Sequence, residues 1–145
     1  MSEVEDVIQR GLVAFFEEKI PFNKLLGMKV VSIAQGCCEM SIPIRPELVG
    51  DPSRPALHGG VISALADTVG GLAMLSKYLD AGVPRVSTID LRIDYLQPGT
   101  TDETLTAVSE VIRIGNRVGV TNTVVQQGDR VVAQARGVYN IVRSD

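Results

Sequence analysis

Residues 58–79 read HGGVISALADTVGGLAMLSKYL, and this stretch decides the fold because it holds the longest apolar run of the 145-residue chain. Its apolar side chains fall on nearly every side of a helix that begins at residue 59, and a helix that is apolar all round is buried. The adjacent Gly70 and Gly71 weaken such a helix but allow another backbone to come close. The stretch therefore predicts one long helix in the middle of the core, with a single carboxylate, Asp67, inside it.

The sequence on either side of this helix predicts strands. Alternating apolar positions and β-branched residues mark two strands before the helix and four after it, over residues 28–34, 37–45, 88–95, 104–114, 117–127 and 130–142. Short glycine turns join the last three strands as hairpins. Residues 46–55, with three prolines, predict a loop. Pro43 fits an edge strand or the end of a strand.

An amphipathic helix is predicted near the N-terminus, where residues 4–19 place apolar side chains at helical spacing and Pro21 ends the pattern. The order is then helix, two strands, buried helix and four strands. This order indicates the α+β class, with an antiparallel sheet of about six strands wrapped around one long central helix. We expect a single domain over residues 1–145, made of an N-terminal helical segment (1–24) and a core (25–142).

Composition narrows the class of function. A net charge of −3 argues against nucleic acid as the main partner. The only two cysteines, Cys37 and Cys38, are neighbours that point to opposite faces of a strand, so no disulfide framework is expected and a reducing compartment is favoured. The acidic start is unlike a secretory signal, and the apolar run at 61–76 is short for a membrane span and carries Asp67. We expect a cytoplasmic protein with no membrane or nucleic-acid partner.

Asp67 is the most informative residue. Packing a helix that has no polar stripe would remove water from this carboxylate, which is costly unless the group has partners or a chemical use. The alternative is a structural aspartate bonded to buried backbone or to Thr68. The HGG sequence at 58–60 opens the same helix, where the first turn leaves backbone N–H groups unpaired and glycine lets a ligand oxygen approach them. A helix start that merely needs flexible residues is the alternative there.

The spacing of these two features predicts an oligomer. Gly59 and Asp67 lie eight residues apart, hence about 12 Å along one helix, which is too far for both to act on one acyl carbon. If two such helices run antiparallel across a two-fold axis, Asp67 of one subunit approaches Gly59 of the other. We therefore expect a homodimer, or a dimer of dimers, with two equivalent sites in each dimer.

These motifs resemble those of a known family. HGG at 58–60, followed by ALADT at 64–68, is similar to the signature of the hotdog-fold acyl-CoA thioesterases of the PaaI-like (phenylacetic acid degradation) type. STIDL at 87–91, YLQPG at 95–99 and Gly137 also resemble that family. The resemblance implies a hotdog fold over residues 25–142 and the hydrolysis of an acyl-CoA thioester to free acid and CoA.

The resemblance also implies catalytic roles. Asp67 corresponds to the catalytic carboxylate, acting as general base or as nucleophile, and the Gly59 N–H polarises the thioester carbonyl. His58 helps to shape the site, and Thr88 helps to hold the attacking water. Strict alternation puts Thr88 on the polar face of its strand, away from the helix, so this role requires a bulge or Ser87 in its place.

Substrate-binding residues are expected around this centre: Gly60, Asp51, Thr68, Ser87, Arg113, Gly115 and Arg117. Many members of the family have Asn shortly before HGG, and Asp51 in that place would exchange an amide donor for a carboxylate. Arg113 and Arg117 flank a turn and are the candidates for the anionic end of CoA, with ordinary surface charge as the alternative. One histidine and two adjacent cysteines give no zinc spacing, so we expect no metal. No cofactor is expected either, because CoA is part of the substrate.

Two other functions stay open. A hotdog enoyl-CoA hydratase or dehydratase usually needs a histidine paired with an acid, and His58 is the only histidine of the chain. A non-catalytic acyl-CoA sensor would use the same pocket without turnover, and a desolvated carboxylate beside the acyl group speaks against it. The sequence leaves the acyl group itself open.

Overall fold

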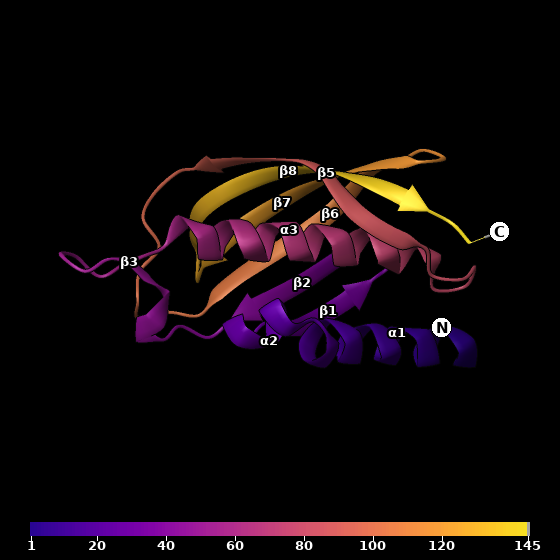
Figure 1. Cartoon of the computed structure of the whole chain (residues 1–145), viewed down its shortest axis with the longest axis horizontal. Coiled ribbons are helices and arrows are strands. Elements are labelled where there is room, and N and C mark those ends of the chain that lie inside the picture. The colour runs from indigo at the N-terminus through magenta and orange to yellow at the C-terminus, as the bar shows by residue number, and fades with distance from the viewer. Residues whose placement is uncertain (145) are drawn as a thin grey trace.

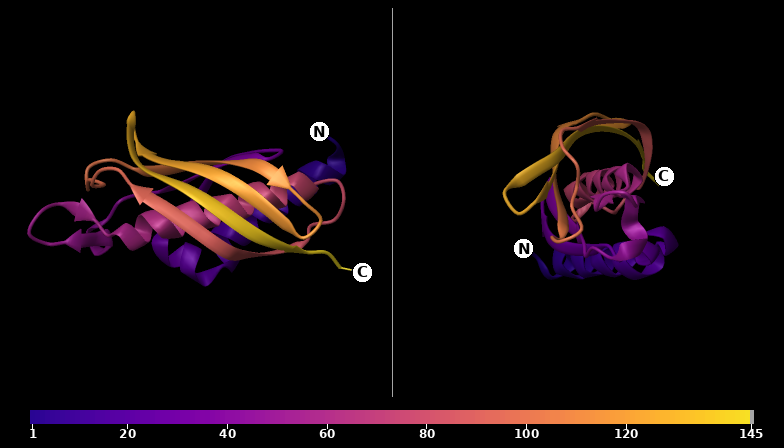
Figure 2. Two further views of the ribbon diagram at one scale, coloured as in Figure 1. Left: turned by 90° about the horizontal axis from the view of Figure 1, so that it is seen from above. Right: turned by 90° about the vertical axis from the view of Figure 1, so that its left-hand side faces the viewer.

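The fold is built around one helix. In a computed structural model that describes residues 1–144, the long apolar stretch forms α3 (Gly59–Leu75), and a six-stranded antiparallel sheet curls around it (Figure 1). The end-on view in Figure 2 shows the sheet arching over this helix and the N-terminal helices lying beneath it. The α+β class, the six strands and the central helix are confirmed.

The sheet has the strand order β1-β2-β6-β7-β8-β5, which leaves β1 and β5 at its edges. Its strands are β1 (Lys29–Ala34), β2 (Cys37–Ile42), β5 (Arg85–Tyr95), β6 (Leu105–Ile114), β7 (Val118–Gln127) and β8 (Arg130–Val142). β5 begins earlier than the alternation predicts. β2 ends before Pro43, as a residue without an N–H requires.

Three helical pieces form the N-terminal segment. α1 (Glu3–Ala14) starts at a capping box, in which Ser2 Oγ accepts the Glu5 N–H at 3.1 Å. A π-helical turn, η1 (Phe15–Lys19), continues α1 and stops before Pro21, as predicted. The helix α2 (Pro21–Leu26) is absent from the sequence-based prediction. Proline is well suited to the first position of a helix, so Pro21 ends one helical piece and begins the next.

The segment before α3 corrects the prediction of a loop. Residues 46–55 contain the 3₁₀ turn Pro46–Leu48 and the strand β3 (Val49–Asp51), which pairs with β4 (Ala56–Leu57). The His58 N–H also donates to the Leu48 carbonyl at 2.9 Å, so this small ribbon fixes the start of α3. Strands of two or three residues are too short to show a periodic pattern.

The surroundings of α3 differ from the prediction on one side. The face of the helix that packs against the sheet is excluded from solvent, and its Leu65, Val69 and Leu72 are fully buried. Along the other side runs a partly exposed stripe of small and polar residues: Ser63, Ala64, Asp67, Thr68 and Gly71. The expectation of a helix buried all round is therefore wrong for this stripe. By composition, Gly59–Tyr78 passes for a membrane span, but 61% of that window is buried inside the fold, as in a core helix.

Tyr139 of β8 ties α3 to the sheet. Its side chain is 1% exposed, and its hydroxyl donates to the backbone carbonyl of Asp67 at 2.8 Å. Two glycines make room for the ring, since a Cβ at Gly70 would collide with Tyr139 Oη and one at Gly137 would lie 2.5 Å from Tyr139 Cε2. The close approach at Gly70 is thus made by a side chain, the Tyr139 ring, and not by another backbone as the glycine pair predicts.

Replacing Gly70 by alanine should destabilise the protein. Alanine favours a helix interior over glycine by about 1 kcal/mol, but its methyl group here would displace Tyr139, and overpacking costs about 1–3 kcal/mol. We expect the free energy of unfolding, measured with urea, to fall by up to about 2 kcal/mol, which is the overpacking cost less the gain in helix propensity. Gly11→Ala is the matched control, because nothing lies within 4 Å of a Cβ at that helical glycine. A Gly70→Ala protein as stable as this control would contradict the packing account.

Candidate active site

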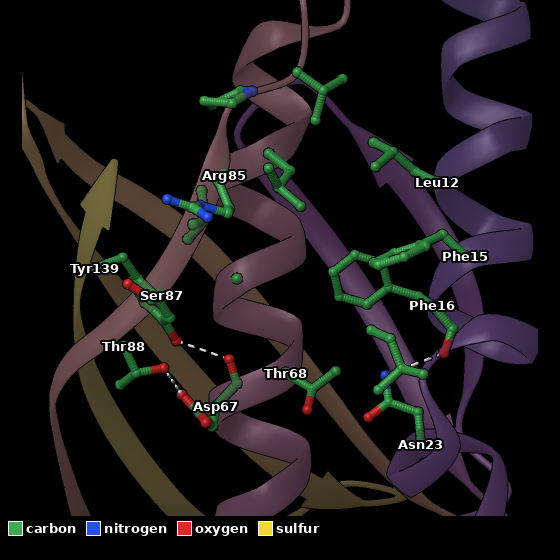
Figure 3. Close-up of a pocket in the computed structure, with 16 residues that line it drawn as sticks. Leu12, Phe15, Phe16, Asn23, Asp67, Thr68, Arg85, Ser87, Thr88 and Tyr139 are labelled. Atoms are coloured by element: carbon green, nitrogen blue, oxygen red, sulfur yellow. Dashed lines mark hydrogen bonds between the residues drawn. The ribbon is translucent and has the colours of Figure 1, made fainter. Parts of the chain in front are cut away.

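Asp67 and Thr88 form the polar centre of the site. Thr88 Oγ1 on β5 donates a hydrogen bond to Asp67 Oδ1 on α3 at 2.7 Å (Figure 3). The contact depends on a β-bulge, because the pairing of β5 with β8 shifts register between Thr88 and Asp90. The bulge turns Thr88 toward the helix, and it leaves Ile89 56% exposed. The bulge that the role of Thr88 requires is thus present.

Asp67 is held from both its side chain and its backbone. The Tyr139 hydroxyl donates a hydrogen bond to the backbone carbonyl of Asp67. The Thr88 hydroxyl donates one to the carboxylate of the same residue. Burial, with the nearby Asp67 charge, raises the pKa of Tyr139 well above its usual value, so the phenol stays a neutral donor. Tyr139 was not predicted as a site residue from the sequence. Gly70 and Gly137 were the available signal, since glycines that face each other across a helix and a strand leave room for a large side chain.

A cavity of about 500 Å³ opens beside this pair. Figure 3 shows Asp67 and Thr88 near one end of it, with Leu12, Phe15 and Phe16 of the N-terminal segment on its far wall. Thr68 and Ser87, both predicted substrate-binding residues, also line it. The part of the stripe that holds Asp67, Thr68 and Gly71 is therefore the floor of a groove.

The start of α3 offers one free backbone donor. His58 is the N-cap, and its Nδ1 accepts the Gly60 N–H at 2.8 Å, so the Gly60 donor is used within the chain. The Gly59 N–H, in the first turn, has no acceptor inside the helix. On the other side of Gly59, the Tyr95 hydroxyl donates to its carbonyl at 3.1 Å. Of the predicted donors, Gly59 is the one that remains for a ligand.

Gly59 and Asp67 do not meet within one chain. They lie at separate positions along α3, and Gly59 lines a different cavity, of about 300 Å³, together with Tyr95 and Leu96. The helix rise places them about 12 Å apart along the axis. One chain therefore supplies a carboxylate centre and a donor centre as two separate half-sites.

The remaining predicted residues lie farther along the surface. Arg113, Gly115 and Arg117 line one cavity of about 450 Å³ at the turn between β6 and β7. Asp51 lines another, of about 500 Å³. Its carboxylate accepts bonds from Ser53, which lower its pKa. Neither group shares a cavity with Asp67 within one chain.

The Asp67 carboxylate is less enclosed than the sequence indicates. The single chain leaves the residue partly exposed, because the groove floor faces outward. The two cysteines take no part in this groove, and among residues 1–144 no group of three or more His, Cys, Asp or Glu side chains is placed to hold a metal ion. The chemistry that this arrangement offers is a carboxylate and a hydroxyl at the end of an apolar groove.

Comparisons with known proteins agree on one family. The model of the thioesterase superfamily matches residues 55–134. The chain is 31% identical over 138 residues to the medium/long-chain acyl-CoA thioesterase YigI of Escherichia coli, which covers 87% of this chain and 88% of that protein. It is 32% identical over 115 residues to the acyl-coenzyme A thioesterase PaaI of E. coli, covering 79% of this chain and 77% of PaaI.

Solved structures show the same fold. A Shewanella oneidensis protein related to the thioesterase superfamily superposes with a TM-score of 0.87 and 28% identity, covering 97% of this chain and 99% of that one. The structure of E. coli PaaI superposes with a TM-score of 0.82 and 25% identity, over 97% and 96% of the two chains. The wrapped helix is thus the architecture of these relatives.

Thiol alkylation should distinguish the two cysteines. Cys37 is exposed, whereas burial of Cys38 raises its pKa to about 11, so its thiol stays protonated and unreactive near neutral pH. We expect iodoacetamide at about pH 8 to modify only Cys37 in the native protein and both residues after denaturation. Peptide mass spectrometry measures this. Rapid modification of native Cys38 would show that the strand β2 opens readily.

Proposed function

The chain belongs to the thioesterase superfamily, whose hotdog fold it shares, and we propose that it hydrolyses acyl-CoA thioesters with Asp67 as the catalytic carboxylate. The observation that carries the proposal is the hydrogen-bonded pair of Asp67 and Thr88 in an apolar groove. A carboxylate bonded to a hydroxyl can hold and deprotonate a water, and the groove can hold an acyl chain. The relatives YigI and PaaI are named as acyl-CoA thioesterases.

The proposed reaction uses a water molecule and the two carboxylate oxygens of Asp67. Thr88 occupies Oδ1, which leaves Oδ2 to accept a proton from a water positioned beside the Thr88 hydroxyl. The water oxygen forms a bond to the thioester carbon as its proton passes to Asp67. The tetrahedral intermediate then collapses and its C–S bond breaks. The departing CoA sulfur takes the proton back from Asp67, which restores the carboxylate as the free acid is released. We prefer this role to direct attack by Asp67, and no cofactor is needed.

A second subunit would complete the site. The partly exposed stripe of α3 lies beside β5, an edge strand whose Ser87, Thr88 and Ile89 are exposed. Uncovered edge strands are normally protected or paired, so β5 is the natural place for a two-fold contact. Antiparallel α3 helices across that axis would place the Gly59 N–H of one subunit beside Asp67 of the other. That N–H would stabilise the oxyanion.

The CoA moiety would extend away from the groove. Arg113 and Arg117 share one cavity and supply positive charge for its phosphates. His58 would hold the first turn of α3 in place through its bond to Gly60 rather than act on substrate. Asp51 is held by Ser53 and Arg54, and it would shape the rim beside the start of α3.

The rival functions have weaker support. A hydratase would need a histidine free to move protons, but Nδ1 of His58 is used to cap α3. A sensor would bind acyl-CoA without releasing a thiol. The bond between Thr88 and Asp67 supports hydrolysis over sensing, because it orients a carboxylate for which simple binding of an acyl chain has no use.

Loss of the Asp67 carboxylate should stop turnover without unfolding the protein. We expect Asp67→Ala to lower kcat for thiol release from acyl-CoA at least about a hundredfold, the usual effect of removing a general base. The melting temperature should stay close to that of the wild type, since Asp67 is only partly buried. Asp80→Ala, which removes an exposed aspartate, is the control. Near-normal rates for Asp67→Ala would reject this role.

Mixed dimers would test whether two subunits share one site. Gly59→Pro removes the N–H alone, because proline is favoured at the first helical position and His58 already has the extended backbone (φ −64°, ψ 130°) that precedes proline. A Cβ there would lie 3.3 Å from the exposed Tyr95 ring, which can move aside. We expect Gly59→Pro homodimers to lose about two orders of magnitude in kcat.

Co-expression of Gly59→Pro with Asp67→Ala should then restore activity. A mixed dimer combines the intact Asp67 of one chain with the intact Gly59 of the other, so one of its two sites works. Random pairing predicts about a quarter of wild-type activity per protein, measured by thiol release. Two affinity tags would verify that mixed dimers form. Verified mixed dimers as inactive as their parents would show that the site does not cross the interface.

A further inference from the structure

We propose that the groove selects straight-chain acyl groups of medium length, and that Gly71 is the position that admits the chain. The inference rests on the proposed thioesterase function, because it takes Asp67 and Thr88 as the reacting end of the groove. It extends that function by naming the substrate class and the residues that would determine it.

The cavity is polar at one end and mostly apolar over the rest of its length. Hydroxyl and carboxylate groups gather at the end that holds Asp67 and Thr88, where Thr68 and Ser87 also lie. Beyond them most of the lining is aliphatic or aromatic: Leu12, Phe15, Phe16, Ile20, Leu75, Val83, Pro84 and Val86. The Arg85 guanidinium and the Asn23 amide are the polar exceptions. A thioester carbonyl placed at the polar end would direct its alkyl chain along this apolar surface, where each buried methylene stabilises the complex.

The length of the groove matches a medium chain. Its floor on α3 runs from Asp67 to Leu75, eight residues later. This is about 12 Å along the helix axis, the length of an extended chain of roughly eight to ten carbons. Figure 3 shows Leu12 beside the end of the cavity that is far from Asp67. A single aryl ring would fill only the first part, and a chain of roughly sixteen carbons would protrude.

Gly71 lies where the chain must pass. It follows Asp67 by one helical turn, about 6 Å, on the same partly exposed stripe. A Cβ at this position would meet only Tyr139 Cε1, at 3.9 Å, so a small side chain fits beside the ring and extends over the groove floor. Any larger residue would narrow the groove at about the fifth carbon of the acyl chain. Its neighbour Gly70, in contrast, serves the contact with Tyr139.

The N-terminal segment provides the opposite wall through an irregular turn. The π-helical turn Phe15–Lys19 presents Phe15 and Phe16, whose rings meet edge to face with centroids 5.9 Å apart. The buried Asn23 donates from Nδ2 to the Phe16 carbonyl at 3.0 Å, which stabilises the turn against α2. Such π-turns are frequent at functional sites. Phe15, 49% exposed, can therefore cover an alkyl chain without being needed for the core.

A chain-length series of acyl-CoA substrates gives the first test. With straight chains of four to sixteen carbons, we expect kcat/KM of the wild type to rise roughly three- to fourfold per methylene and to level off near eight to ten carbons. Phenylacetyl-CoA should fall below the optimum. A flat profile, or a maximum at four carbons or at the aryl substrate, would overturn the proposal.

Variants at Gly71 give the second test. Gly71→Val should move the optimum to about four to six carbons and lower the ratio of decanoyl to butyryl kcat/KM at least about tenfold, with Gly71→Ala intermediate. Gly11→Ala and Gly11→Val are matched controls at an exposed helical glycine outside the cavity, and they should keep the wild-type profile. An equal loss at every chain length would show that Gly71 affects folding or chemistry but not length.

A binding experiment separates this proposal from the hydrolysis itself. S-alkyl-CoA thioethers have no carbonyl to hydrolyse, so calorimetry measures their binding affinity without any contribution from turnover. We expect Kd to fall with chain length up to about ten carbons and Phe15→Ala to weaken decyl-CoA binding at least about fivefold. Phe22→Ala is the matched control, because Phe22 is exposed and lies outside the cavity. Length-dependent binding without turnover would reject hydrolysis and support the role of the groove in selecting chain length. Turnover without length-dependent binding would support hydrolysis and reject that role of the groove.

Discussion

The bond from the Tyr139 hydroxyl to the Asp67 carbonyl is the contact on which the geometry of the site depends. It joins the central helix to β8 at the residue that bears the carboxylate, and it lies in a part of the core where a polar group without a partner would be costly. The missing side chains of Gly70 and Gly137 leave room for the Tyr139 ring. With the helix fixed to the sheet there, the bulge on β5 needs to turn only one hydroxyl, that of Thr88, to complete the pair.

The sheet covers only part of the helix, and this incomplete cover leaves space for the groove. Full enclosure of α3 would stabilise the core but leave no space for a ligand. The chain instead places small and polar residues on the stripe that the sheet does not reach, with Phe15 and Phe16 across from it. These residues lower the cost of leaving the stripe open. The groove therefore follows from the amphipathic division of a helix that looks uniformly apolar in sequence.

The elements with a local periodic pattern could be predicted from the sequence. The six strands of the sheet follow from apolar alternation with a period of two residues, and the central helix follows from the length of its apolar run. Asp67 stands out as the only charge within that run. Features that depend on contacts between distant segments could not be predicted. The cavity for Tyr139 and the ribbon of β3 and β4 arise from contacts across the fold. The bulge at Ile89 could be inferred only from the role that the resemblance implies for Thr88, with Ser87 as the alternative. The partial exposure of Asp67 likewise depends on which side of α3 the sheet leaves bare.

In the proposed reaction, the groove would also connect the choice of substrate with the rate of hydrolysis. In the single chain without a ligand, Asp67 is partly exposed, so water can reach it through the open side of the groove. An alkyl chain lying along Gly71 and Leu75 would displace most of that water, and a second subunit over the stripe would displace more. Lower local polarity strengthens both the bond from Thr88 to Asp67 and the attraction of a backbone N–H for a developing oxyanion. A chain that fills the groove would therefore raise the turnover number as well as the affinity, whereas a short chain would leave the polar end wet and the electrostatic contribution to catalysis weak.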